Sequence, residues 1–135
     1  MSLKLQKALL VDDDCLTNYI NQIVLEESGM FEKVEMVETA MEALNKLEYD
    51  ETHHIEPPEI IFLDLNMPGL DGWDFINEYS YHHKPGTKRS VIVLLTSSNN
   101  PEDKIKAVYA KGVYAYVVKP LTNEKLMDVV GKYLH

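Results

Sequence analysis

Short apolar runs alternate with amphipathic segments along all 135 residues of the chain. Runs rich in branched and aromatic side chains occupy residues 8–12, 34–38, 60–63, 91–95 and 113–118. Runs of this length and composition predict β-strands, and an almost continuous apolar run such as 91–95 is typical of a strand buried on both faces. We therefore expect five strands separated by longer connections.

The first two connections have the period of a helix. Apolar residues of the first recur at steps of three and four, namely Leu16, Ile20, Ile23 and Val24. Gly29 follows them and is a common kind of helix end. In the second connection, Thr39 and Glu42 match the T-x-x-E capping box, and we expect the helix to end near Tyr49. Its predicted buried face consists of Ala40, Ala43, Leu44 and Leu47.

Three more helices are predicted. The third follows Gly72, and its apolar residues are Trp73, Ile76 and Tyr79. The fourth has Asn99 or Asn100 as its cap and is ended by Gly112, and the last covers residues 122–134. The polar stretches that hold the doublets His53-His54 and His82-His83 and the pair Pro85-Gly86 are predicted loops, and neither doublet is assigned a function.

This alternation predicts one α/β domain over residues 1–135. Parallel neighbouring strands need crossover connections, so helices are expected on both faces of a parallel sheet. The length and the 45% hydrophobic content support a single core and leave no room for an output domain. Ligands of such sheets bind at the carboxyl ends of the strands, near the point where strand order reverses.

The charge balance and the lone cysteine restrict the partners and the compartment. The chain has 22 acidic and 13 basic side chains, and its net charge of −9 disfavours direct binding to nucleic acid. No apolar run approaches the roughly 20 residues that cross a bilayer, so no contact with a membrane is expected. Cys15 cannot form an internal disulfide, which suits a reducing compartment. We expect a cytoplasmic protein.

Four of the predicted strands end at chemically useful side chains. The first ends at the acids of residues 12–14 and the third at Asp64; the fourth ends at the hydroxyls of residues 96–98 and the fifth at Lys119. Clustered carboxylates repel one another unless a cation compensates, and Mg²⁺ (or Mn²⁺) prefers such oxygen ligands. A hydroxyl and an ammonium beside the metal would neutralise a phosphoryl group. Asp64 suits the role of nucleophile, because carboxylates form acyl phosphates.

Four sequence blocks at these strand ends occur in order and cover essentially the whole chain. They are Leu10-Val-Asp-Asp13, Phe62-Leu-Asp-Leu-Asn-Met-Pro-Gly69 with Asp71-Gly72, Leu95-Thr-Ser97, and Tyr116-Val-Val-Lys-Pro120. Together they resemble the receiver domains of two-component response regulators, in particular single-domain receivers like the chemotaxis regulators. The resemblance implies a doubly wound, five-stranded parallel sheet of the flavodoxin-like (βα)5 type, with strand order 2-1-3-4-5.

The resemblance also implies roles for the acidic residues. Asp64 matches the phosphoacceptor. Asp12 and Asp13 match the acidic pair that holds the metal, with Asp64 and the main-chain carbonyl of Asn66 as further ligands.

A second group of residues matches the parts of the switch. Thr96 resembles the hydroxyl that moves to the phosphoryl group, and Lys119 resembles the ammonium that pairs with it. Tyr116 resembles the aromatic residue whose rotamer reports the switch. The Lys119-Pro120 bond is expected to be cis, as in the family.

The implied function is a phosphorylation-dependent signalling switch and not an enzyme in the ordinary sense. A sensor histidine kinase or a histidine phosphotransfer protein would donate the phosphoryl group, and self-catalysed phosphorylation and dephosphorylation are expected. A downstream protein target would then be contacted, by family resemblance through the fourth helix, the fifth strand and the last helix. We expect a monomer, or a weak dimer on phosphorylation.

Plainer interpretations stay open for single residues. We interpret Asp14 as a helix cap and not as a metal ligand. Asp64 could begin a turn, Thr96 could be an ordinary hydroxyl at a strand end, and Tyr116 could be a half-buried strand aromatic.

Two other functional classes fit the sequence less well. An aspartate-nucleophile phosphatase needs a second Asp two residues after the nucleophile, where this chain has Asn66. A flavin-binding module needs a Gly- or Ser/Thr-rich phosphate loop after the first strand, and the sequence has none there. A binding module that works without phosphorylation remains an alternative.

Overall fold

The computed structural model describes residues 5–82 and 89–134. Strands in this part of the chain are β1 (Leu5–Val11), β2 (Phe31–Val37), β3 (Ile60–Asp64), β4 (Val91–Thr96) and β5 (Val113–Val118). Its helices are α1 (Cys15–Ser28), α2 (Ala40–Thr52), α3 (Gly72–His82), α4 (Pro101–Tyr109) and α5 (Asn123–Leu134). None of these described helices is both long and apolar enough to cross a membrane. The predicted loop at Pro85-Gly86 and the residue His83 lie outside the described residues.

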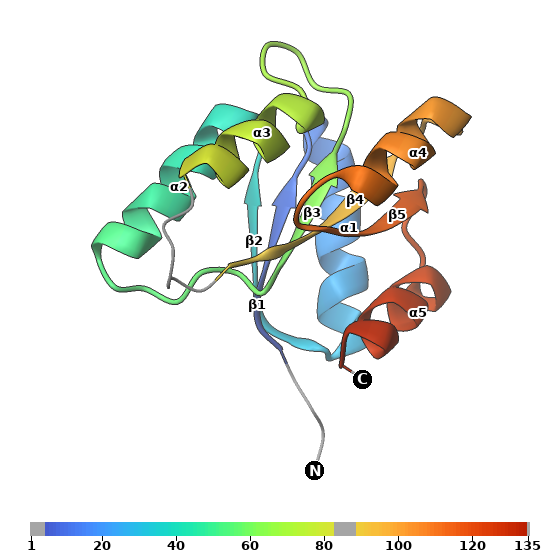
Figure 1. Ribbon diagram of the computed structural model, residues 1–135. Helices are drawn as coiled ribbons and strands as arrows, with labels where there is room; N and C mark the ends of the chain where they lie inside the picture. The colour runs from blue at the N-terminus through green and yellow to red at the C-terminus, as the bar shows by residue number, and fades with distance from the viewer. Residues whose placement is uncertain (1–4, 83–88, 135) are drawn as a thin grey trace.

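The strands form one parallel sheet in the order β2-β1-β3-β4-β5 (Figure 1). This order confirms the predicted fold class. The chain leaves β1 toward β2 on one side and later returns to place β3 on the other side of β1. The carboxyl ends of β1 and β3 therefore meet at the point where strand order reverses, which is where this kind of sheet binds ligands.

Each face of the sheet has its own hydrophobic layer, because successive strand residues point to opposite sides. On one face, Leu10 and Phe62 belong to a buried cluster with Leu25 of α1 and Leu126 of α5. The other face is covered by α2, α3 and α4, with a core of Leu9, Val11, Ala40, Ala43, Ile61, Leu63, Leu65, Met67, Phe75, Ile76, Tyr79, Ile92, Leu94 and Ala107. The strands β1 and β3, whose carboxyl ends meet at the sheet edge, are therefore packed on both faces.

Helix ends largely follow the predicted signals. Thr39 caps α2, and its hydroxyl accepts a hydrogen bond of 3.0 Å from the main-chain amide of Glu42, which confirms the predicted N-cap. Asn100, not Asn99, caps α4, and this helix ends at Tyr109 with Ala110 as its C-cap, so the predicted end at Gly112 is wrong. Gly29 ends α1 in the left-handed conformation with φ of 71°. α2 runs to Thr52 and is thus slightly longer than expected.

The apolar residues of α1 lie mostly on its outer side. Leu16 is 62% exposed, Ile20 is 50% exposed and Ile23 is also exposed. The residues that α1 buries are Asn18, Asn21 and Leu25. The period of the sequence identified the helix, but most of the residues that carry this period do not face the core.

A cluster of charged side chains joins β1, β2 and α2. Lys7 Nζ lies 3.2 Å from Glu35 Oε1 and 3.3 Å from Asp50 Oδ2, and Lys46 Nζ lies 2.9 Å from Glu35 Oε2. Burial acts to raise the pKa of Glu35, but hydrogen bonds from Lys46 and Lys7 outweigh it and hold this pKa below its ordinary value. The exposed Lys33 also lies 3.6 Å from Glu35 Oε2. We call the other four side chains, Lys7, Glu35, Lys46 and Asp50, the balanced cluster, since they are two cations and two anions.

Helices α3 and α4 touch through a cation and a ring. Lys106 Nζ of α4 lies 4.5 Å from the ring centroid of Trp73 in α3, a cation–π distance. Trp73 is the only tryptophan of the chain.

Candidate functional site

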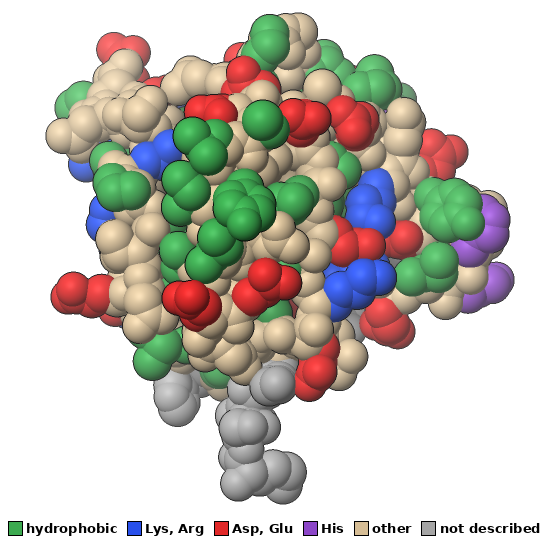
Figure 2. Space-filling model, turned by 180° about the vertical axis from the view of Figure 1, so that it is seen from behind, with side chains coloured by type: hydrophobic (Ala, Val, Ile, Leu, Met, Phe, Trp, Pro, Cys, Tyr) green, Lys and Arg blue, Asp and Glu red, His purple; other side chains and the backbone are tan. Residues whose placement is uncertain are grey.

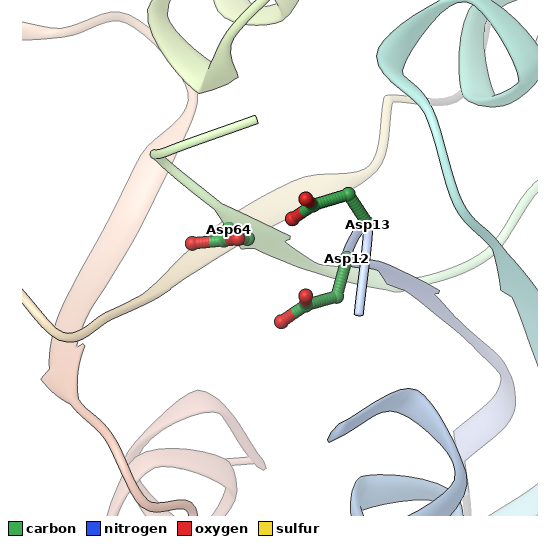
Figure 3. A group of neighbouring side chains, drawn as sticks. All are labelled: Asp12, Asp13 and Asp64. Carbon is green, nitrogen blue, oxygen red and sulfur yellow. The ribbon is translucent and has the colours of Figure 1, made fainter. Parts of the chain in front are cut away.

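Three carboxylates gather at the carboxyl edge of the sheet (Figure 3). Asp12 and Asp13 follow β1 directly, and Asp64 is the last residue of β3, the neighbouring strand. One carboxylate oxygen from each of the three lies within 4.8 Å of the others. Asp12 and Asp64 are buried, while Asp13 is exposed. The structure therefore brings together the three carboxylates that the sequence puts forward as metal ligands.

Lys119 extends into the same cluster from the loop after β5. Its Nζ lies 2.7 Å from Asp12 Oδ2 and 3.5 Å from Asp64 Oδ1. Burial acts to lower the pKa of Lys119, but the hydrogen bond to Asp12 and the charge of Asp64 outweigh it, so this pKa is raised. The Lys119-Pro120 bond is cis. Lys119 is therefore a permanently charged partner of the two buried carboxylates at neutral pH.

The carboxyl group of Asp64 is a weaker acid than an ordinary aspartate. Its pKa rises from 3.8 to about 6, mainly because burial penalises the charged form, and the negative charge of Asp12 adds to this effect. Lys119 and the amide of Asn66, which donates to Asp64 Oδ1 at 3.3 Å, act in the opposite direction. At pH 7 Asp64 is still mostly ionised and can act as a nucleophile. A cation bound beside it would stabilise this ionised form further.

The donor set of the site fits Mg²⁺. Asp12, Asp13 and Asp64 place three carboxylates against the one ammonium of Lys119, so negative charge is left over in the described part of the site. Mg²⁺ prefers a few carboxylates with water in the remaining positions, and it would supply charge neutralisation here. The main-chain carbonyl of Asn66 stays a predicted ligand. We call Asp12, Asp13, Asp64 and Lys119 the acidic site.

The hydroxyl groups of Thr96 and Tyr116 both form hydrogen bonds with the loop after β4. Thr96 is fully buried at the end of β4, and its Oγ1 accepts a hydrogen bond of 3.0 Å from the amide of Ser98. The Tyr116 hydroxyl donates to the Ser98 carbonyl at 2.8 Å, and Ser98 Oγ donates to Asp103 of α4 at 2.8 Å. Ser98 therefore connects both predicted switch residues, Thr96 and Tyr116, with α4.

Two further residues support the site: Asn18, which the sequence did not indicate, and Gly72, which the sequence indicated only as part of a block and as the start of the third helix. Buried Asn18 donates from Nδ2 to the carbonyls of Asp12 at 2.9 Å and Val37 at 3.0 Å, so it holds the start of the loop that carries the acids. A Cβ at Gly72 would lie 2.8 Å from the Asp64 carbonyl oxygen, so only glycine allows α3 to begin this close to β3. A pattern of apolar residues carries no signal for either contact.

Asp14 has a structural role. Its side chain accepts hydrogen bonds of 3.0 Å from the Thr17 hydroxyl and 3.0 Å from the Leu16 amide, and these bonds lower its pKa. Asp14 is the N-cap of α1, as predicted.

The described histidines of the two doublets lie on helix ends. His53 stacks on Tyr49 with ring centroids 3.9 Å apart, and His82 Nε2 lies 3.2 Å from Glu78 Oε2. These contacts are local to α2 and α3.

Comparison with known proteins gives a consistent match. The family model of the response regulator receiver domain matches residues 8–131. Response regulator Rcp1 of Synechocystis is 31% identical over 123 residues, which cover 90% of this chain and 82% of that protein. PhoP of Pseudomonas aeruginosa, a two-component response regulator, is 34% identical over 120 residues, which cover 89% of this chain and 48% of PhoP. The chain thus spans about half the length of some curated relatives.

Solved structures have the same architecture. A two-component response regulator from Cytophaga hutchinsonii superposes with a TM-score of 0.88 at 35% identity, covering 97% of this chain and 98% of that one. A CheY-like receiver domain protein from Methanospirillum hungatei superposes with a TM-score of 0.75 at 26% identity, covering 98% of this chain and 94% of that one. In both cases the similarity extends over nearly the full described chain.

Proposed function

Since the chain belongs to the response regulator receiver family, we propose that it is a signalling switch in which Asp64 accepts a phosphoryl group with Mg²⁺ bound beside it. The observation that carries this proposal is the acidic site, where a buried nucleophilic carboxylate, two further carboxylates and one ammonium meet at a strand edge. Family membership supports the reaction class. The position of the charges supports the assignment of the residues.

The proposed reaction is the transfer of a phosphoryl group from a phosphohistidine. A carboxylate oxygen of Asp64 attacks phosphorus, the bond from phosphorus to the imidazole nitrogen breaks, and the imidazole keeps the bonding electrons and takes up a proton. Mg²⁺, when bound, neutralises charge on the phosphoryl oxygens. Lys119 supplies a second cation from its position 3.5 Å from Asp64. The Thr96 hydroxyl would leave the Ser98 amide to donate a hydrogen bond to the product.

The donor of the phosphoryl group is proposed to be a sensor histidine kinase or a histidine phosphotransfer protein. The exposed apolar residues of α1 support this, since Leu16 lies in the first turn of the helix that follows the acidic loop. Figure 2 shows hydrophobic side chains gathered on the face that α1 covers, with acidic side chains around them. An apolar surface of this kind fits the side of a helical partner domain. The donor would then present its histidine beside Asp64.

The output is proposed to be a contact with a downstream protein in the cytoplasm, made by a monomer or a weak dimer. The switch would act through the loop after β4, because Ser98 links Thr96 and Tyr116 to Asp103 of α4. α4 also exposes Val108 on its surface. A change at Thr96 can therefore be passed to a surface that a partner can reach.

Neither alternative class explains the site as well. In a phosphatase that uses an aspartate nucleophile, an acid two residues further on protonates the leaving group. Here that position is Asn66, which is exposed and whose main-chain amide donates a hydrogen bond to Asp64. A binding module without phosphorylation needs no surplus of buried carboxylates, which costs stability.

Intact mass after incubation with acetyl phosphate tests the proposal. The wild-type chain is expected to gain one phosphoryl group when Mg²⁺ is present and none when it is removed by chelation. Asp64→Asn should gain none, whereas Asp128→Asn, at an exposed position of α5, should behave like the wild type. Uptake by Asp64→Asn at the wild-type level would refute the assignment of the nucleophile. No uptake by any chain would leave the phosphorylation-independent binding module as the better account.

A further inference from the structure

A second lysine holds the loop that carries Lys119. The ammonium of Lys125, in the first turn of α5, donates 2.7 Å to the carbonyl of Val118 and 3.0 Å to the carbonyl of Pro120. These two carbonyls lie on either side of Lys119. One cation therefore ties together the main chain immediately before and after the lysine of the acidic site.

The main chain at Lys119 is fixed from the other side as well. Its amide donates a hydrogen bond of 2.8 Å to the carbonyl of Thr96 at the end of β4. With the two bonds from Lys125, the backbone around Lys119 is held at three points. A lysine has a long and flexible side chain, so a fixed backbone limits how far its ammonium can move away from Asp12 and Asp64.

The location of Lys125 is unfavourable for α5 itself. The N-terminal turn of a helix carries partial positive charge, and a cation there is disfavoured. Lys125 is the third residue of α5, and its side chain is half-buried. Helix stability alone therefore does not account for a lysine at this position. The two carbonyl bonds do, since a charged donor makes stronger hydrogen bonds than a neutral one.

We propose that Lys125 is a positioning residue that keeps the Lys119 ammonium at Asp12 and Asp64. This inference rests on the proposed function for the part that concerns phosphorylation. Lys125 acts through the backbone of Lys119 and does not touch the reacting atoms itself. Its loss lets the loop after β5 relax and moves the Lys119 ammonium away from the phosphoryl group.

The test compares the rate of phosphorylation by acetyl phosphate in four chains: wild type, Lys125→Met, Lys119→Met and the double variant. Lys125→Met should lower the maximal rate constant about tenfold, because small errors in the position of a charged group are costly in phosphoryl transfer. The affinity for Mg²⁺ should not fall, because the Lys119 ammonium is not a metal ligand and only competes with the metal for Asp12 and Asp64. In the Lys119→Met background, Lys125→Met should have no further effect, since Lys119 is the group that it positions.

Two further variants separate positioning from folding. Lys125→Arg keeps a cationic donor and should restore most of the rate. Lys132→Met removes an exposed lysine of the same helix and should match the wild type. Equal slowing by Lys125→Met in the presence and absence of Lys119, or an unchanged rate in the single variant, would overturn the proposal.

A crystal structure of Lys125→Met tests the proposal without any measurement of phosphorylation. The positioning proposal expects Lys119 Nζ to lose its contact with Asp12 Oδ2, and an unchanged contact would overturn it. If even the wild-type chain takes up no phosphate, the proposed function fails, and this structural comparison alone then decides the role of Lys125.

Discussion

The balanced cluster and the acidic site each combine buried charges with partly exposed ones in one small domain, and the two groups differ in net charge. In the balanced cluster, Lys7 and Lys46 match Glu35 and Asp50. In the acidic site, three carboxylates face one lysine. The pKa of Glu35 is lowered, whereas that of Asp64 is raised to about 6.

This difference separates a structural role from a binding role. A buried charge with its full set of partners holds elements together, here β1, β2 and α2. A buried charge without enough partners weakens the fold until a ligand supplies the missing charge. The two clusters are therefore expected to respond in opposite ways when a charge is removed, and three measurements test this difference.

The largest effect is expected in the balanced cluster. Lys7→Met leaves Asp50 buried without its cation and removes one of the partners of Glu35, so the free energy of unfolding should fall by about 3–5 kcal/mol. Urea unfolding measures it. The matched control is Lys33→Met, since Lys33 is an exposed lysine 3.6 Å from Glu35, and it should change stability by less than about 0.5 kcal/mol. Similar losses in both variants would show that burial does not distinguish these lysines.

Addition of Mg²⁺ should have the next largest effect, and only through the acidic site. At a concentration about 100 times its dissociation constant, a ligand of the folded state raises the free energy of unfolding by about 2.7 kcal/mol. Asp13→Asn should lose most of this gain, because it removes one carboxylate of the site. A gain that persists in Asp13→Asn would place the cation elsewhere.

The smallest effect is the loss of folding stability that the buried charge of Asp64 causes. Its folded pKa of about 6 lies above the unfolded value of 3.8, so the folded state binds more protons between these values and stability is lost as pH rises through them. The full shift corresponds to about 3 kcal/mol, and water on the side of the exposed Asp13 screens part of it. Without Mg²⁺, Asp64→Asn should therefore be more stable than the wild type by about 2 kcal/mol at pH 7.

The pH dependence of that difference provides the control. Near pH 3 both chains carry a neutral group at position 64, and their stabilities should converge. Saturating Mg²⁺ should also remove the difference in unfolding free energy between Asp64→Asn and the wild type at pH 7. A less stable Asp64→Asn at pH 7 without Mg²⁺ would mean that Lys119 already balances the site.

The sequence was sufficient to predict the order of elements, since strand runs and helix caps are local signals. It also placed Asp12, Asp64 and Lys119 at strand ends, and parallel pairing alone then brings them to one edge. The resemblance supplied the strand order and the roles of the residues. The period of the apolar residues gave the buried face of α2 correctly, with Ala40 and Ala43 in the core. It did not do so for α1, which turns Leu16, Ile20 and Ile23 outward and Asn18 inward.

Contacts between distant residues were the other part that the sequence could not give. Lys7 and Asp50 are 43 positions apart, and nothing in the composition around either residue indicates that they pair. The bonds from Lys125 to the loop of Lys119 depend on the path of the chain between β5 and α5, which a pattern of apolar and polar residues does not encode. Such contacts follow from the packed fold and not from any single segment.

The contact between Trp73 and Lys106 has a spectroscopic consequence. Because the chain holds one tryptophan, its emission comes from a single place, the start of α3. An ammonium 4.5 Å from the indole ring affects the brightness and colour of that emission, so a shift of α4 relative to α3 becomes visible without any label. The protein therefore carries its own optical probe, located at the start of α3 and in contact with α4, the helix that Ser98 links to Thr96.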